Sequence, residues 1–270
     1  MTTLNDEMTA RSSVNGRRYP VPALEKGLDI LELLADTPRG LTQTEIANRL
    51  DRSVSEIFRM IACLRDRGYL ATVADGDRYM LTSKLFELSH RHPPMKRLLT
   101  EAMPLMNELA RTLDQSCHLT VYHGGAQLVV AQVDSLGGMG FSVRMGARID
   151  ILQSASGYVL IACQAPSITE RMLAEYKGAV ARKDLGAMRK VLDGVRRRGY
   201  AEMDSVQVRG VRGISFPVRT FDGNAVAALA VPYLEQLDDP NRKSLDQARE
   251  ALREAAGRLS LAIGGGDAGT

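Results

Sequence analysis

Two helix-start motifs near the N-terminus constrain the fold of this chain more than any other feature. Thr42-Gln43-Thr44-Glu45 and Ser53-Val54-Ser55-Glu56 each place a hydroxyl residue three positions before a glutamate, which is the pattern of a capping box. Apolar residues at helical spacing follow both motifs: Ile46, Ala47 and Leu50 after the first, and Ile57, Ile61 and Leu64 after the second. The sequence therefore predicts two short helices joined by a tight turn.

The flanking segments complete this small domain. Apolar residues recur at helical spacing from Leu24 to Ala35, which predicts a first helix over residues 23–36. After the second capped helix, residues 69–73 and 78–81 flank an Asp-Gly turn, which is typical of a β-hairpin. A helix, two capped helices and a hairpin follow one another in the order of a winged helix-turn-helix. Each helix of the capped pair buries only one face against the other, so the first helix and the hairpin must cover the apolar surface that remains.

The outward face of the second capped helix is the candidate nucleic-acid interface. Short hydroxyl groups at a helix N-terminus can approach phosphates and base edges, and arginine binds guanine or phosphate. The side chains that this face could present are those of Arg52, Ser53, Ser55, Glu56, Arg59 and Met60. A small helical subdomain with a solvated charged face remains the alternative.

The chain beyond this domain has a different pattern. Residues 1–19 are polar and predict a disordered arm, and Pro93-Pro94 marks a domain boundary. The expected helices after it cover residues 95–113, 168–176, 184–198 and 244–262, with a short apolar helix that opens at Ser154 and runs through Ala162. The expected strands cover residues 117–122, 127–133, 141–144, 214–219 and 225–231.

Charge and composition exclude several classes of protein. The 35 basic and 32 acidic side chains give a net charge of only +3, so DNA binding must depend on local placement. Cys63, Cys117 and Cys163 form no paired motif, which excludes a disulfide framework and a Cys-x-x-Cys zinc site. We expect no metal and no cofactor. The sequence shows no apolar run of membrane length and no signal peptide, so we expect a cytoplasmic protein. It also shows none of the common nucleotide-binding and hydrolase motifs, so we expect that it is not an enzyme.

Several segments resemble the IclR family of bacterial transcriptional regulators over residues 20–263. They include the opening segment Val21–Leu31, the winged-helix segments Leu41–Ala47 and Arg65–Leu70, and the effector-domain segments Arg198–Ala201 and Gly210–Val218. The resemblance implies an α+β chain with an N-terminal winged helix-turn-helix, a linker helix and a C-terminal GAF/PAS-like domain with a mixed sheet and flanking helices.

The resemblance also implies a domain division and an assembly. It places the disordered arm at residues 1–19, the DNA-binding domain at 20–82, the linker helix at 83–94, the effector-binding domain at 95–263 and a flexible tail at 264–270. A homodimer or a dimer of dimers would bind a palindromic or near-palindromic operator, because the operator repeats the two-fold symmetry of the protein. The expected role is control of a catabolic operon.

Carried over by position, the family's DNA contacts fall on the helix that begins at Ser53. The expected contacts are Thr42, Thr44, Arg52, Ser53, Ser55 and Arg59. Glu56 stands where the family often has a small hydroxyl residue. Its carboxylate would repel phosphate, so we expect it to cap the helix rather than to contact a cytosine amine.

The family's effector pocket lies between the helix opened by Ser154 and the last hairpin. The mapped positions are Gly146, Leu152, Ser154, Ala155, Gly157, Asp204, Gly213, Ser215, Ala230 and Pro232. Several depart from the family pattern through loss of polar groups, among them Leu152 for histidine and Gly213 for cysteine. A helix N-terminus suits a carboxylate, so we expect a small organic acid, with an aromatic or alkyl body favoured over a two- or three-carbon keto acid.

Two other functions remain open at this stage. A redox-sensing regulator would use Cys117 or Cys163, and oxidation of the thiol would change its affinity for DNA. A GAF-like enzyme would instead use the winged helix as a protein-interaction module. The pocket positions offer no convergent acid, base and nucleophile, which argues against the enzyme.

Overall fold

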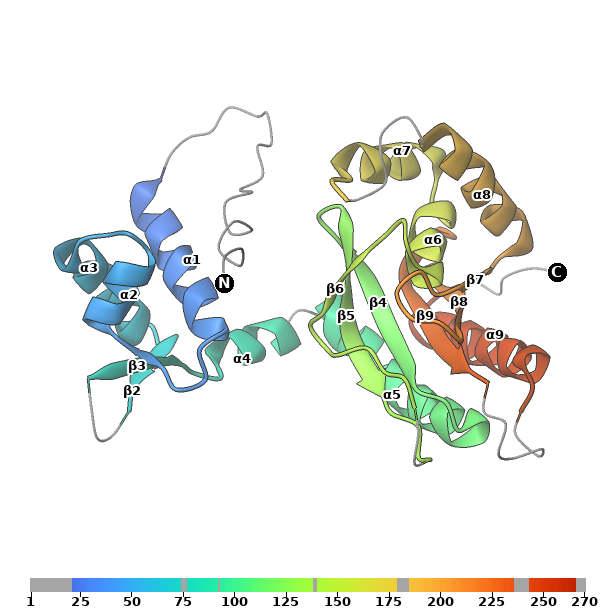
Figure 1. The fold of residues 1–270 in the computed structure, drawn as a ribbon, viewed down its shortest axis with the longest axis horizontal. Coiled ribbons are helices and arrows are strands. Elements are labelled where there is room, and N and C mark those ends of the chain that lie inside the picture. Colours follow the sequence, from blue (N-terminus) through green and yellow to red (C-terminus); the bar gives the residue numbers. More distant parts are fainter. Residues whose placement is uncertain are drawn as a thin grey trace. The chain divides into compact units, whose positions relative to one another are not determined.

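The computed structural model describes residues 21–73, 77–91, 93–137, 140–178, 185–235 and 243–265. It divides into two compact units, Met1–Arg91 and His92–Thr270 (Figure 1). The arm expected at residues 1–19, the tip of the hairpin and most of the expected C-terminal tail lie outside the described residues. Each unit has its own hydrophobic core and is considered separately.

The first unit is a winged helix-turn-helix, as the sequence predicts. Its helices are α1 (Pro22–Ala35), α2 (Gln43–Arg49), α3 (Val54–Asp66) and α4 (Lys84–Arg91). Its strands β1 (Leu41–Thr42), β2 (Leu70–Thr72) and β3 (Arg78–Leu81) form an antiparallel sheet in the order β1-β3-β2. The sequence patterns did not predict β1, which has two residues and exists only through its pairing with β3.

Both predicted capping boxes are present. The Glu45 N–H donates to the Thr42 hydroxyl at 3.2 Å, and the Glu56 N–H donates to the Ser53 hydroxyl at 3.3 Å. Each glutamate carboxylate in turn accepts a hydrogen bond from the backbone N–H of its capping residue. The turn between α2 and α3 requires a positive φ of 52° at Asp51, a residue type that tolerates this conformation. These caps fix where α2 and α3 begin.

The second unit is built around a six-stranded sheet in the order β6-β5-β4-β9-β8-β7. Its strands are β4 (Cys117–His123), β5 (Ala126–Val133), β6 (Arg148–Asp150), β7 (Ala201–Asp204), β8 (Val211–Arg219) and β9 (Ala225–Leu234). The α+β fold class is confirmed, but the sheet is antiparallel in all its described pairings rather than mixed. The strand expected at residues 141–144 was wrong: this segment is irregular, and the edge strand β6 follows it. The edge strand β7 was not predicted.

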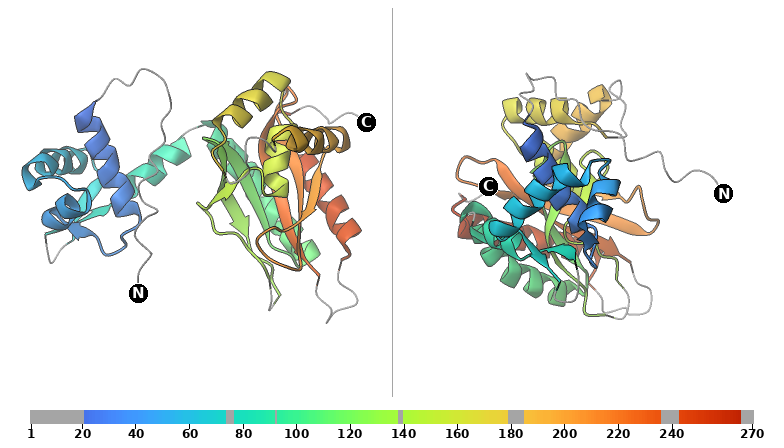
Figure 2. Two further views of the ribbon diagram at one scale, coloured as in Figure 1. Left: turned by 45° about the horizontal axis from the view of Figure 1, so that its top comes forward. Right: turned by 90° about the vertical axis from the view of Figure 1, so that its left-hand side faces the viewer.

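Helices cover both faces of this sheet (Figures 1 and 2). They are α5 (Pro93–Leu113), α6 (Ala155–Ala162), α7 (Pro166–Glu175), α8 (Leu185–Arg198) and α9 (Leu245–Ala262). One core joins α5 and α9 to the sheet, and a second joins α6, α7 and α8 to the opposite face. Strand β9 shows the alternation, since Ala227 and Leu229 belong to the first core and Ala228 to the second. The face that carries α6 also carries the pocket described below.

Candidate functional site

The predicted nucleic-acid contacts gather around the N-terminal half of α3. Arg52, Ser53, Ser55 and Arg59 are all exposed, and neither arginine forms an ion pair with another described residue. Thr44 is exposed at the start of α2, whereas Thr42 is half-buried and its hydroxyl serves as the cap. The arrangement therefore leaves two cations and several hydroxyl groups on one surface, which suits a polyanion.

The carboxylate of Glu56 is already bound by other groups of the protein. Its Oε2 accepts the Ser53 N–H at 3.0 Å, and its Oε1 pairs with the Lys26 ammonium of α1 at 2.6 Å. The Lys26 hydrogen bond, followed by that of the Ser53 backbone, lowers the pKa of Glu56 to about 2. The expectation that Glu56 caps α3 is confirmed, and its charge is offset by Lys26.

The hairpin that forms the wing is tied to the start of α2. Arg78 of β3 forms an ion pair with Glu45 at 2.9 Å and donates to the Gly40 carbonyl oxygen at 3.0 Å. The hydrogen bond from the Thr42 backbone N–H, followed by this pairing with Arg78, lowers the pKa of Glu45. The wing and the helix pair are thus connected through one guanidinium group.

The second unit contains a pocket on the α6 face of its sheet. The cavity measures about 100 Å³, which is of the order of an engineered cavity of ~150 Å³ that binds benzene. Six of the ten predicted effector positions line it: Ser154, Ala155, Asp204, Gly213, Ala230 and Pro232. Apolar side chains form the remaining walls, chiefly those of Phe141, Val143, Ile149, Met203, Val211 and Val231. Mostly apolar walls with a few polar groups are typical of small-molecule sites.

Four predicted effector positions do not line the pocket. Leu152 is only 1% exposed and belongs to the second core. The Ser215 hydroxyl is buried and donates to the Leu229 carbonyl oxygen at 3.0 Å. Gly146 has a φ of 81° in the turn before β6, and a Cβ at Gly157 would overlap the carbonyl oxygen of Ile151. These four residues shape the structure around the pocket rather than its wall.

The polar side chains that sequence reasoning missed include His118, Gln153, Ser156 and Gln207. His118 is 6% exposed on β4, and its Nδ1 has no hydrogen-bond partner among the described residues. Burial lowers the pKa of His118 to about 4, so the ring is neutral near pH 7. The alternation of β4 could have located it, since Cys117 and Leu119 belong to the opposite core.

The N-terminus of α6 forms one wall of the pocket. Ser154 caps the helix by accepting the Gly157 N–H at 3.2 Å, and the buried amide of Gln127 donates to the same hydroxyl. The residues Ser154, Ala155 and Ser156 all line the pocket. The positive end of a helix dipole therefore borders the cavity, which favours a negative or hydrogen-bond-accepting group of a ligand.

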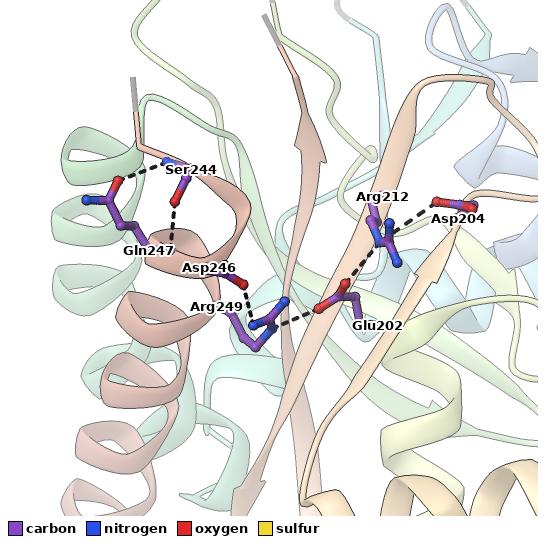
Figure 3. A network of polar contacts seen from close by, with 7 residues as sticks. All are labelled: Glu202, Asp204, Arg212, Ser244, Asp246, Gln247 and Arg249. Carbon is purple, nitrogen blue, oxygen red and sulfur yellow. Dashed lines mark hydrogen bonds and ion pairs between the residues drawn. The ribbon is translucent and has the colours of Figure 1, made fainter. Parts of the chain in front are cut away.

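A chain of charged contacts connects the rim of the pocket with α9 (Figure 3). Arg212 of β8 lies between Asp204 at 3.9 Å and Glu202 at 3.0 Å, both on β7. Glu202 also binds Arg249 of α9 at 2.8 Å, and Arg249 binds Asp246 at 2.6 Å. The edge strand that supplies Asp204 is thus held to α9 on the other face of the sheet.

The two cysteines considered for redox sensing, Cys117 and Cys163, offer little reactive thiolate. Cys117 and Cys163 are buried, and burial raises the pKa of Cys117 to about 12 and also raises that of Cys163. A thiol oxidised by a regulatory signal needs exposure and thiolate character, so the geometry disfavours a sensor at either residue. Within the described ranges, no group of three His, Cys, Asp or Glu side chains could hold a metal ion, and no helix has the length and apolarity to cross a membrane.

Comparison with known proteins finds matches along most of the chain. A profile described as the IclR helix-turn-helix domain matches residues 23–74, and one described as bacterial transcriptional regulator IclR C-terminal matches residues 95–261. The chain is 29% identical over 259 residues to the HTH-type transcriptional regulator KdgR of Escherichia coli (strain K12), with 94% of this chain and 97% of the relative covered. It is 31% identical over 253 residues to the regulator BhcR of Paracoccus denitrificans (strain Pd 1222), with 90% and 88% covered.

A solved structure shares the fold. An IclR homologue from Microbacterium hydrocarbonoxydans, complexed with 4-hydroxybenzoate, matches with a TM-score of 0.74 and 24% identity, and the match covers 89% of this chain and 98% of that one.

Proposed function

The chain belongs to the IclR family of bacterial transcriptional regulators, and from this premise we propose that α3 binds an operator while the pocket of the second unit binds the effector that controls it. The protein is a transcriptional regulator with a helix-turn-helix DNA-binding domain. The functional division that we propose is residues 20–82 for DNA, 83–94 for the linker and 95–263 for the effector. A regulator of genomic DNA acts in the cytoplasm, which is where we expect it.

The proposed DNA contacts are Thr42, Thr44, Arg52, Ser53, Ser55 and Arg59. The observation that supports them is the exposed N-terminal half of α3, with Arg52 and Arg59 unpaired among the described side chains. Arg59, one turn into the helix, is the best candidate for a bidentate contact with guanine in the major groove, and Arg52 for a phosphate contact. Thr42 contributes to DNA binding indirectly, because its hydroxyl caps α2 and fixes the backbone at the start of that helix.

We propose that two copies of the chain bind the operator together. Apolar side chains on α1 are unusually exposed: Leu24 is 59% and Leu28 48% accessible, and Leu85 and Leu88 on α4 are also exposed. Such rows at helical spacing suit packing against the same helix of a second copy. A dimer, or a dimer of dimers, would then present two α3 helices to a palindromic or near-palindromic site.

The proposed effector is a small organic acid with an apolar body, and the proposed target is a catabolic operon. The supporting observation is a pocket with apolar walls, a helix N-terminus and the neutral His118 ring. The related protein bound to 4-hydroxybenzoate makes hydroxylated aromatic acids the first class to test. The effector acts only if it binds one arrangement of the regulator better than the other.

Selection of genomic DNA by the purified protein, at two salt concentrations, tests the operator. We expect recovery of a recurring inverted repeat that persists at the higher salt, because base contacts outlast phosphate attraction. Enrichment without a motif that vanishes at the higher salt would contradict the proposal.

Titration calorimetry tests the effector with 4-hydroxybenzoate, benzoate and pyruvate as probes. We expect the aromatic acids to bind and pyruvate to bind weakly, since pyruvate offers little apolar area. Tight binding of pyruvate with no heat from either aromatic acid would overturn the proposed effector class and leave the operator proposal intact.

A further inference from the structure

Helix α3 presents an apolar row beside its polar one. Val54 is 44% and Phe58 57% exposed, and residues four apart lie on the same side of a helix. Ser55 and Arg59 form the neighbouring row with the same spacing. The helix thus exposes a large aromatic ring directly next to the proposed phosphate and base contacts.

The ring of Phe58 is not needed by the core of its unit. Ile57 and Ile61 supply the buried face of α3 and are at most 2% exposed. Phe58 and Val54 instead line a shallow surface groove with Gln43, Ser55, Glu56 and Arg59. The Gln43 amide donates to the Val54 carbonyl oxygen at 3.1 Å, which joins the start of α2 to the start of α3 beside this groove. Packing of the hydrophobic core therefore does not explain the aromatic residue at position 58.

The charges around the groove indicate its occupant. Arg59 lines the groove, and Arg52 stands two residues before Val54 in the chain. Neither arginine forms an ion pair with another described side chain, while Glu56 is already paired with Lys26. A partner that covers this surface must place apolar groups against Val54 and Phe58 and negative charge near the unpaired arginines. DNA carries both apolar groups and negatively charged phosphates, so we take it as the occupant. The apolar group on the base edges of the major groove is the C5-methyl group of thymine, and side chains such as phenylalanine read it by direct contact.

We propose that Phe58, supported by Val54, packs against thymine methyl groups in each half of the operator and selects thymine at those positions. The assignment rests on the proposed function of α3, and it adds a determinant of specificity that the polar contacts do not provide. Arg59 supplies affinity through charge and hydrogen bonds. Phe58 supplies discrimination between thymine and a base that lacks the methyl group.

Replacement of thymine by deoxyuridine tests this assignment, because it removes the methyl group and keeps the Watson–Crick edge. In the operator recovered by genomic selection, each thymine of a half-site is replaced in turn and the Kd is measured. The wild-type protein should lose about fourfold in affinity at one or two positions, as expected for one buried methyl group. Phe58→Ala should bind the thymine and deoxyuridine duplexes equally well.

Two control variants separate this effect from a general loss of binding. Arg59→Ala should weaken binding to every duplex and keep the preference for thymine. Phe221→Ala removes a ring that is 86% exposed in the other unit and should behave as wild type. The proposal is overturned if the wild type shows no methyl preference at any position or if Phe58→Ala retains that preference. Failure to recover an operator at all would count against the proposed function of α3, and with it against this inference.

Discussion

The two units assemble their candidate sites in different ways. In the first unit, the proposed DNA contacts lie on one short stretch around the start of α3, and their side chains are exposed. In the second unit, the pocket walls come from β4, β6 and the segment before it, the start of α6, and strands β7 to β9, and His118 is almost fully buried. The comparison teaches that substitution of an exposed, unpaired side chain of α3 should change binding alone, whereas a substitution near the pocket should change stability and binding together.

Gly157→Val should have the largest effect and tests the buried side of this comparison. A Cβ at Gly157 would overlap the Ile151 backbone, so the start of α6 must shift and the second unit should lose about 3 kcal/mol of unfolding free energy. Thermal unfolding followed by circular dichroism measures the loss. The matched control is Gly194→Ala, where a Cβ meets nothing within 4 Å and a small gain is expected for a helix interior. A Gly157→Val protein of wild-type stability that lost only effector binding would break the comparison.

His118→Leu should change how stability depends on pH. The pKa of His118 is about 4 in the folded protein against 6.5 ordinarily, so the unfolded chain binds a proton first as the pH falls. The wild type should therefore lose about 3 kcal/mol of stability between pH 6.5 and 4 from this residue, and the leucine variant should not. Denaturant titrations at a series of pH values measure the difference.

A second histidine on the same strand provides the control for this experiment. His123 is exposed, and His123→Leu should leave the acid sensitivity of the wild type in place. If His118→Leu lost stability over the same pH range as the wild type, His118 would not carry the effect.

Arg59→Ala tests the exposed side of the comparison. Loss of a base or phosphate contact should weaken operator binding about 5- to 150-fold, while the unfolding midpoint and effector binding stay at their wild-type values. Fluorescence anisotropy at several salt concentrations separates the two kinds of contact, because loss of a phosphate contact also lowers the salt slope by about one. Arg197→Ala, an exposed arginine of α8, should leave operator binding unchanged. Equal losses in both variants would mean that charge alone governs binding.

Glu56→Gln should have the smallest effect. The pKa of Glu56 is about 2 in the folded protein, below its ordinary 4.5, so its pairing with Lys26 stabilises the protein above pH 4.5 and this contribution disappears as the pH falls toward 2. The glutamine variant should lack this dependence, keep its cap and bind the operator nearly as well as the wild type. Unfolding midpoints measured from neutral to acidic pH check the first point. A large loss of operator affinity at neutral pH would instead give Glu56 a role in recognition.

The accuracy of sequence reasoning differed between central and edge elements. The capped helices, the hairpins and the long strands β4, β5, β8 and β9 carry their own patterns and were predicted. The missed strands β1, β6 and β7 have two to four residues and all lie at sheet edges. Such short strands form because a longer neighbouring strand offers unpaired backbone N–H and C=O groups for hydrogen bonding. Local residue patterns do not predict this pairing.

The sequence by itself determined the helix-turn-helix, because capping boxes and helical periodicity act over a few residues and do not need the rest of the chain. It also determined the family through segments spread over both units. Only the tertiary structure decided which residues face the pocket: it set Leu152 and Ser215 among buried groups and turned His118 toward the cavity. The physical reason is that a strand residue's surroundings come from helices and strands far away in sequence, whereas an exposed helix face is fixed by its own turn.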